Sequence, residues 1–309
     1  MDIIDLHCDT LYKAVTEDIS FDCERVEAKL NDNPQRCRMQ CYAIWIPDTY
    51  TGDRAEAMFH TAYRRLQQEC EQHHVSLLSP CEPVKSRFLT SINTAFYTVE
   101  NASVLNGKLE NVRLLSACGV RMMTLTWNAS NQIGDGADVK NAQGITDFGK
   151  KVIAEMEQHH IMIDVSHASK KLFYDIAEIT KKPFVASHSN AYAVTPHRRN
   201  LTTEQFEIIC HCGGLVGINF HNAFLNKNPE KASTEDVIRH IEHFLSLGGE
   251  DVICFGSDFD GGTLPADITD SRIYDKIYEL LCRRNYKESL IQKIFYANAL
   301  NFFENFDNR

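Results

Sequence analysis

Short aliphatic runs alternate with longer amphipathic stretches along the chain, and this alternation restricts the fold more than any other feature. The runs are apolar on both faces, which is typical of parallel strands that helices cover. The predicted strands are Ile3–His7, Met39–Ile46, Ala95–Glu100, Arg121–Trp127, Ile161–His167, Phe184–His188, Leu215–Phe220 and Val252–Asp258. The predicted helices between them include Ala55–His73, Thr146–His159, Lys170–Ile179, Thr203–Cys210 and Thr234–Leu247. Three of these helices begin with cap sequences, at Thr146, Thr202–Gln205 and Ser233–Asp236.

Such an alternation over 309 residues predicts an α/β fold, the (β/α)8 barrel of the TIM type. Residues 1–309 are expected to form a single catalytic domain, because no Pro- or Ser-rich linker divides them. A doubly wound open sheet is the alternative, but no Gly-x-Gly-x-x-Gly turn follows the first strand. Val75–Leu78 is expected to add a short strand, and Glu288–Phe303 to form an amphipathic helix that closes the barrel.

The overall charge and hydropathy exclude some classes of partner. A formal net charge of −10 repels the phosphate backbone, so no nucleic-acid partner is expected. No apolar run reaches the ~18 residues that a membrane span needs. Asp2 and Asp5 interrupt the order of basic and then apolar residues that marks a signal peptide. We therefore expect a cytoplasmic protein with no membrane partner.

The cysteines and two histidine-rich tetrapeptides favour structural roles. The cysteine count of 11 is odd and the spacing irregular, which indicates buried free thiols. The end of a helix before Gly213-Gly214 explains Cys210-His211-Cys212 more simply than metal binding does. Glu-Gln-His-His occurs at Glu71–His74 and at Glu157–His160, in each case where a predicted helix ends before a strand. Imidazole side chains at the C-terminus of a helix can interact favourably with the helix dipole.

The first strand ends in a histidine and an aspartate two residues apart, His7 and Asp9. Residues i and i+2 of a strand point to the same side, about 6.5 Å apart. The pair can hold a metal ion, or it can be an ordinary His–Asp hydrogen bond at the entry to a loop.

Other strands also end in polar side chains that can bind metals or substrate. These are Glu100 after the third strand, Trp127 and Asn128 after the fourth, His167 after the fifth, His188 after the sixth and Asp258 after the eighth. Each has a structural alternative: a carboxylate at a helix N-terminus, a capping or core histidine, or an Asp-Gly turn. Together, however, they lie at the barrel face where active sites occur. Clustered buried charges there require a cation.

Imidazole and carboxylate ligands without thiolate suit Zn, Mn, Fe or Co. Five ligands are too many for one tetrahedral ion with an open position, and they suit two ions about 3.5–4 Å apart that share a bridging group. Many metal-dependent barrel hydrolases bridge their ions with a modified lysine on the fourth strand. Because "RMMTLTWNAS" contains no lysine, Glu100 is the candidate bridge.

These motifs together resemble the membrane dipeptidase (renal dipeptidase) family of amidohydrolase-like barrels, over nearly the whole chain. The similarity rests on the His-x-Asp start, the Glu after the third strand, "DVSH", "SHS" followed by "RRN", and "SDFDG". It implies a zinc dipeptidase in which His7, Asp9 and Glu100 hold one ion and Glu100, His167 and His188 the other. A hydroxide that bridges two such ions can attack the peptide carbonyl.

The resemblance also implies roles for two further residues. Asp258 matches the family's catalytic aspartate, which passes a proton from the attacking water to the leaving amine. Arg199, in "HRRN", matches the arginine that grips the substrate carboxylate. Its alternative is a solvated arginine beside Arg198.

One departure from the family pattern concerns substrate binding. Trp127 stands where mammalian members carry a histidine that is thought to polarise the substrate carbonyl. Indole donates one hydrogen bond but carries no charge. The substrate carbonyl is therefore polarised either by the metal alone or by another donor such as Asn128. The alternative for Trp127 itself is that it only forms a wall of the pocket. The chain also lacks the secretion and lipid-anchor signals of the animal enzymes, so it is expected to be a soluble microbial-type member. Because members of the family are often dimers, the resemblance also implies a possible homodimer.

Two other functions stay open on the sequence. One is a related barrel metallohydrolase that acts on a phosphoester, a lactone or another small amide. The other is a catalytically silent metal-binding homologue, against which the intact Asp258 argues.

Overall fold

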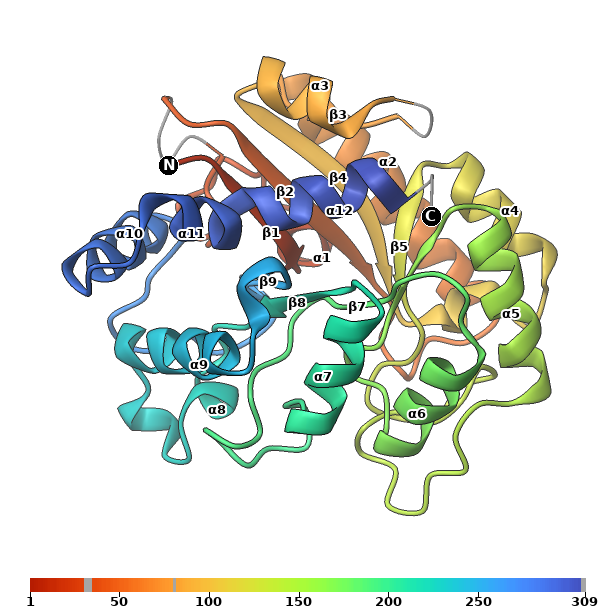
Figure 1. Ribbon diagram of the computed structural model, residues 1–309. Helices are drawn as coiled ribbons and strands as arrows, with labels where there is room; N and C mark the ends of the chain where they lie inside the picture. The colour runs from red at the N-terminus through yellow and green to blue at the C-terminus, as the bar shows by residue number, and fades with distance from the viewer. Residues whose placement is uncertain (31–34, 80–81, 307–309) are drawn as a thin grey trace.

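The computed structural model describes residues 1–30, 35–79 and 82–306, and these form a closed parallel barrel surrounded by helices (Figure 1). The strands are β1 (Ile3–Cys8), β2 (Arg38–Trp45), β3 (Ser76–Leu77), β4 (Asn93–Glu100), β5 (Val120–Thr124), β6 (Met162–Asp164), β7 (Val185–Ala186), β8 (Leu215–Ile218) and β9 (Ile253–Phe255). The α-helices are α1 (Thr10–Glu17), α2 (Asp53–Gln72), α3 (Val84–Thr90), α4 (Glu110–Ala117), α5 (Asp147–Gln158), α6 (Lys170–Ile179), α7 (Thr203–His211), α8 (Asn222–Leu225), α9 (Thr234–Ser246), α10 (Ile273–Arg283), α11 (Glu288–Gln292) and α12 (Asn298–Phe306).

The pairing of β2 with β4 closes the ring. The strands follow the order β2-β1-β9-β8-β7-β6-β5-β4-β3, and β2 also pairs with β4 in parallel from Arg38↔Asn93 to Trp45↔Glu100. The short β3 pairs only with Thr94 and Ala95, before β5 joins the same edge of β4 at Tyr97. The predicted barrel and its extra strand are therefore confirmed, and the open-sheet alternative is wrong.

The predicted helix starts have the expected caps. Thr146 Oγ1 accepts a hydrogen bond from Gly149 N, which begins α5. Reciprocal capping boxes begin α7 and α9, between Thr202 and Gln205 and between Ser233 and Asp236. Each cap satisfies backbone N–H groups that the first helical turn leaves without partners.

The interior of the barrel is apolar towards its amino-terminal end. One buried cluster contains residues from all eight barrel strands, namely Ile4, Leu6, Met39, Cys41, Phe96, Met122, Met162, Val185, Leu215 and Cys254. Residues of α12 complete this cluster, and the rings of Phe96 and Phe303 lie 5.0 Å apart. The predicted final helix thus packs on the amino-terminal opening. It is interrupted by a π-helical segment, Lys293–Ala297, and continues to Phe306.

Four predicted strands in the second half of the chain end earlier than the sequence indicates. β6 ends at Asp164 and not at His167. The backbone N–H groups of Ser166 and Ser187 donate to the side-chain Oδ1 of Asp164, and these bonds take the place of backbone hydrogen bonds between neighbouring strands. His167 and Asp258 then adopt left-handed backbone conformations, with φ of 66° and 64°. The polar residues predicted at the ends of these strands, His167, His188 and Asp258, therefore lie in the loops just beyond them.

The histidine tetrapeptides and the cysteines have structural positions. His73 and His159 are the C-cap residues of α2 and α5, and their Nε2 atoms lie 3.3 Å from Glu69 and 3.4 Å from Glu155. All cysteines of the described segments are free thiols, as predicted, but the predicted burial holds only for Cys8, Cys41, Cys70 and Cys254. Cys282 is exposed at the end of α10, because it lies on the helix face that does not pack on the barrel, and the other described cysteines are half-buried. Cys81 lies outside the described residues.

Candidate active site

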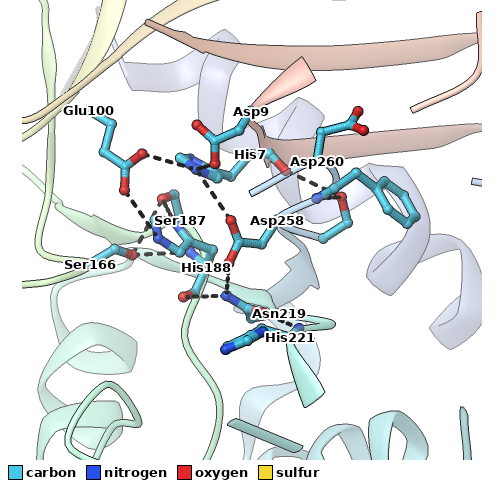
Figure 2. A network of polar contacts seen from close by, with 12 residues as sticks. His7, Asp9, Glu100, Ser166, Ser187, His188, Asn219, His221, Asp258 and Asp260 are labelled. Atoms are coloured by element: carbon cyan, nitrogen blue, oxygen red, sulfur yellow. Dashed lines mark hydrogen bonds and ion pairs between the residues drawn. The ribbon is translucent and has the colours of Figure 1, made fainter. Parts of the chain in front are cut away.

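Six side chains from five separate segments meet at the carboxyl end of the barrel, and all of them except His167 are labelled in Figure 2. His7 belongs to β1, Asp9 caps α1, Glu100 ends β4, and the others follow β6, β7 and β9: His167, His188 and Asp258. His7 is 1% exposed and His188 is fully buried. In the register of the barrel, Glu100 stands opposite Trp45 on β2 and Thr124 on β5.

The carboxylate of Glu100 has a different imidazole on each side. Its Oε2 lies 3.6 Å from His7 Nε2. Its Oε1 lies 3.0 Å from His167 Nε2 and 3.8 Å from His188 Nε2. The two oxygens of one carboxylate therefore face different imidazoles, Oε2 that of His7 and Oε1 those of His167 and His188.

Two more carboxylates approach His7 from its other side. His7 Nε2 lies 3.5 Å from Asp9 Oδ2 and 3.8 Å from Asp258 Oδ1. The His7 and His188 rings are stacked with their centroids 3.9 Å apart. His7, Glu100 and His188 form one group with metal-ligand spacing, and His7, Asp9 and Asp258 form another.

The electrostatics of this cluster call for a cation. Burial lowers the pKa of His7, but the carboxylates of Glu100, Asp9 and Asp258 outweigh burial and raise it to about 10. Burial raises the pKa of Glu100 well above its ordinary value, and the negative charge of Asp9 adds to this. His7 Nε2, His188 Nε2 and Asp9 Oδ1 are buried without a hydrogen-bond partner among the described residues. Divalent cations fit these donors, because they satisfy the lone pairs and neutralise the carboxylates together.

Hydrogen bonds to the second ring nitrogen orient two of the histidines. His167 Nδ1 lies 2.8 Å from Asn128 Oδ1, which can only accept, so the proton is on Nδ1 and the Nε2 lone pair faces Glu100. His188 Nδ1 lies 2.7 Å from Ser187 Oγ. Such partners hold metal-ligating imidazoles in one tautomer. Asn128, predicted to bind substrate, thus contacts a histidine of the cluster.

Asp258 is held by its neighbours in one orientation. Its Oδ2 accepts a hydrogen bond of 3.0 Å from Asn219 Nδ2 (Figure 2). Burial raises the pKa of Asp258 to about 6, although the positive charge of His7 opposes this. A Cβ at Gly261 would lie 2.0 Å from Asp9 Oδ2 and 2.6 Å from Asp258 Oδ1, so only glycine fits beside the two carboxylates.

Arg199 lies beside the cluster, on the loop between β7 and α7. Its side chain is buried, and neither Nε nor Nη2 has a hydrogen-bond partner among the described residues. Burial lowers the pKa of Arg199 to about 10, against the opposing effect of Asp258 and Glu100, so the group stays charged near neutral pH. Its guanidinium can therefore receive an anion.

A cavity of about 590 Å³ adjoins Arg199 and His167. Trp127 is not part of its lining. The Trp127 ring lies 6.0 Å from that of His167 and 5.0 Å from that of Trp45, measured between centroids. Trp127 therefore packs with Trp45 and His167 and does not line this cavity.

A model of the membrane dipeptidase family, peptidase family M19, matches residues 1–308. The chain belongs to this family. Membership makes the protein a metallo-dipeptidase, a hydrolase of dipeptides.

Three proteins similar to this dipeptidase are one uncharacterized relative and two metallopeptidases of known structure. An uncharacterized protein in the pqqA 5′ region of Klebsiella pneumoniae is 34% identical over 216 residues, 67% of this chain and 80% of the relative. The crystal structure of dipeptidase AC, a metallopeptidase of family M19, is 25% identical with a TM-score of 0.92, and covers 100% of this chain and 99% of its own. A metallopeptidase from Rhodobacter sphaeroides, liganded with a phosphinate mimic of L-Ala-D-Ala, is 26% identical with a TM-score of 0.88 over 99% of both chains.

None of the helices in the described part of the dipeptidase is both long enough and apolar enough to cross a membrane.

Two buried aspartates of the dipeptidase, missed in the sequence, brace the segments that carry its site residues. Asp5 accepts hydrogen bonds from Ser257 N (2.9 Å) and Ser257 Oγ (2.6 Å), immediately before Asp258. Asp164 accepts hydrogen bonds from Ser187 N (2.9 Å) and Ser187 Oγ (2.5 Å), immediately before His188. The same arrangement thus occurs twice, on opposite parts of the ring. The sequence carried a signal for it, since "IIDLH" and "MIDVS" share an aspartate after two apolar strand residues.

His240 supports the loop that carries Arg199 in the dipeptidase. It lies in α9 and is fully buried. Its Nδ1 accepts a hydrogen bond from Ala191 N (3.0 Å), and its Nε2 donates one to Leu225 O (3.2 Å). Burial lowers the pKa of His240 to about 4, so the folded protein holds it neutral.

This burial predicts a loss of stability in acid. Above pH 6.5, the approximate pKa of a histidine in the unfolded chain, neutral His240 makes its full contribution to the free energy of unfolding. As the pH drops toward the lower pKa of His240 in the folded protein, only the unfolded chain binds a proton, and this contribution falls. Between about pH 7.5 and about pH 5 we expect His240 to account for about 2 kcal/mol of the fall in unfolding free energy. Denaturant unfolding of wild type and His240→Gln at both pH values measures it. Equal pH dependence in the two proteins would contradict the prediction.

Proposed function

We propose that the protein is a binuclear metal-dependent dipeptidase, with zinc as the native metal. His7, Asp9 and Glu100 would hold one cation, and Glu100, His167 and His188 the other. The observation that carries this proposal is the position of Glu100, whose two oxygens face His7 on one side and His167 and His188 on the other. Two cations bound in this way lower the pKa of a water molecule, so that hydroxide is available near neutral pH.

Asp258 is proposed as the group that moves the proton. Its Oδ1 lies 3.8 Å from His7 Nε2, and burial raises its pKa above the ordinary value, which favours its taking up a proton. The attacking water would give its proton to Asp258, and Asp258 would give it to the amine that leaves when the peptide C–N bond breaks. Asn219 holds the second oxygen of Asp258 and so keeps the first one directed at the cluster.

Arg199 is proposed to bind the free carboxylate of the dipeptide. The buried guanidinium has Nε and Nη2 without partners among the described residues, and a carboxylate can accept from both in a bidentate pair. An anchor for the terminal carboxylate explains a preference for very short peptides. The cytoplasmic location and the homodimer remain predictions.

Metal analysis coupled to a substrate panel tests this function. Protein prepared with ample zinc should contain about two ions per chain and hydrolyse L-Ala-L-Ala or L-Ala-D-Ala. A chelator should abolish both the metal content and the activity, and Zn, Mn or Co added back should identify the effective ion. One ion per chain in fully active protein would refute the binuclear site. Hydrolysis of a phosphoester or a lactone, and of no dipeptide, would refute the proposed substrate.

A further inference from the structure

The cavity beside Arg199 is positively charged in a protein that is negatively charged overall. Five cationic residues contribute to its lining: Lys140, Lys170, Lys171, Arg198 and Arg199. None of the described residues that line it is acidic, although the chain carries a formal net charge of −10. The cavity therefore concentrates positive charge next to the metal-ligand cluster.

Two of the five charges are balanced by carboxylates outside the lining. Lys171 is paired with Asp175, and Arg198 Nε lies 2.6 Å from Asp138 Oδ1. The other three cationic residues are Arg199, Lys140 and Lys170. Lys140 and Lys170 have no carboxylate partner among the described residues, and the Lys170 ammonium lies 5.9 Å from the centre of the Tyr174 ring.

The excess of charge is larger than one substrate carboxylate requires. Arg199 alone accounts for the terminal carboxylate of a dipeptide, which leaves Lys140 and Lys170 facing the cavity without an anion. The remaining lining includes Val139, Val165 and Phe173, which can contact methylene groups. The volume of about 590 Å³ is within the range of small-ligand pockets.

We propose that this dipeptidase prefers substrates whose carboxyl-terminal residue is aspartate or glutamate. The α-carboxylate pairs with Arg199, and the side-chain carboxylate enters the cavity between Lys140 and Lys170. Arg199 lines the cavity together with His167 of the cluster, so the cavity is open to the side chain of a residue whose α-carboxylate Arg199 binds. The inference rests on the proposed function, and it adds a substrate class to it.

The expected selectivity is moderate, since both lysines are exposed to solvent. An exposed ion pair changes an equilibrium by about two- to fivefold, so two lysines together favour a carboxylate over an amide by about tenfold. The two charges act mainly on kcat/KM, because they bind a part of the substrate that does not react.

Matched substrates and variants test the proposal. The kcat/KM values for Ala-Glu and Ala-Gln, each with an L and a D carboxyl-terminal residue, are measured for the wild type and a Lys140→Met/Lys170→Met double variant. We expect a Glu-to-Gln ratio of about 10 in the wild type for at least one configuration and a ratio near 1 in the double variant. The control is Lys151→Met, an exposed lysine of α5 outside the cavity, which should keep the wild-type ratio.

A second measurement needs no variant. Raising the salt concentration from about 0.05 M to about 0.5 M should lower the wild-type Glu-to-Gln ratio, because screening weakens exposed charge pairs. A wild-type ratio near 1 for both configurations, or a ratio that the double variant and salt leave unchanged, overturns the proposal while the dipeptidase function stands. If no dipeptide at all is hydrolysed by metal-loaded protein, the proposed function itself fails.

Discussion

Replacing Asp258 with asparagine should lower kcat by about 10²–10⁴-fold, the usual contribution of a positioned acid or base. Asparagine has the same shape and can still accept the hydrogen bond from Asn219 Nδ2, which lies 3.0 Å from the present carboxylate. It cannot take up the proton of the attacking water. The folded structure and the metal content should therefore remain, and only the chemical step should be lost.

Steady-state kinetics and metal analysis of the same preparation separate the possible roles of Asp258. If Asp258→Asn keeps its metal and loses turnover, the proton-transfer role is supported. If it loses an ion, Asp258 acts as a ligand, as its distance of 3.8 Å from His7 Nε2 also permits. If turnover survives, the role assigned to Asp258 is wrong. Asp251→Asn is the control, since the Asp251 side chain is 78% exposed and lies outside the site.

Replacing Glu100 with glutamine should remove metal binding as well as activity. The amide carries no charge, and its NH₂ group would face one set of imidazoles in place of an oxygen. Because metal polarisation contributes several kcal/mol, turnover should fall on the order of 10³-fold. The metal content should fall below one ion per chain in the same protein.

A matched variant distinguishes loss of the site from loss of the fold. Glu69 is also buried, but it pairs with Arg65 and accepts a hydrogen bond from Phe21 N, away from the cluster. Glu69→Gln should lower thermal stability and leave metal content and kcat near wild-type values. If Glu100→Gln retained two ions, Glu100 would not be the bridge between them.

Much of the fold could be predicted because its signals are local. The cap sequences at Thr146, Thr202 and Ser233 begin helices where expected, since a cap acts within one helical turn. Strand ends were predicted less well. β6 and β9 stop at Asp164 and Phe255 because side chains and left-handed turns end their ladders, and neither feature appears in hydrophobic periodicity.

The histidines and carboxylates that gather at the carboxyl end of the barrel could be predicted from the sequence, whereas the residues that hold them in place could not. Parallel strands of a barrel all present their carboxyl ends to one face, so polar residues after several strands are expected to meet there. His7 and His188 do meet, with their rings 3.9 Å apart. Asn219 carried no comparable signal, because its contact to Asp258 joins residues 39 positions apart.

The amino-acid sequence by itself determined the barrel, the family and the kinds of ligand, since periodicity, caps and motifs act over short stretches of chain. Only the tertiary structure decided which side chains lie next to one another in the cluster. The two oxygens of Glu100 face different imidazoles because closure between β2 and β4 orients that side chain toward segments far away in the chain. Likewise, Lys140 and Lys170 line one cavity with Arg199 because two loops and the start of a helix pack together. Such packing depends on the whole ring, and no short stretch of sequence encodes it.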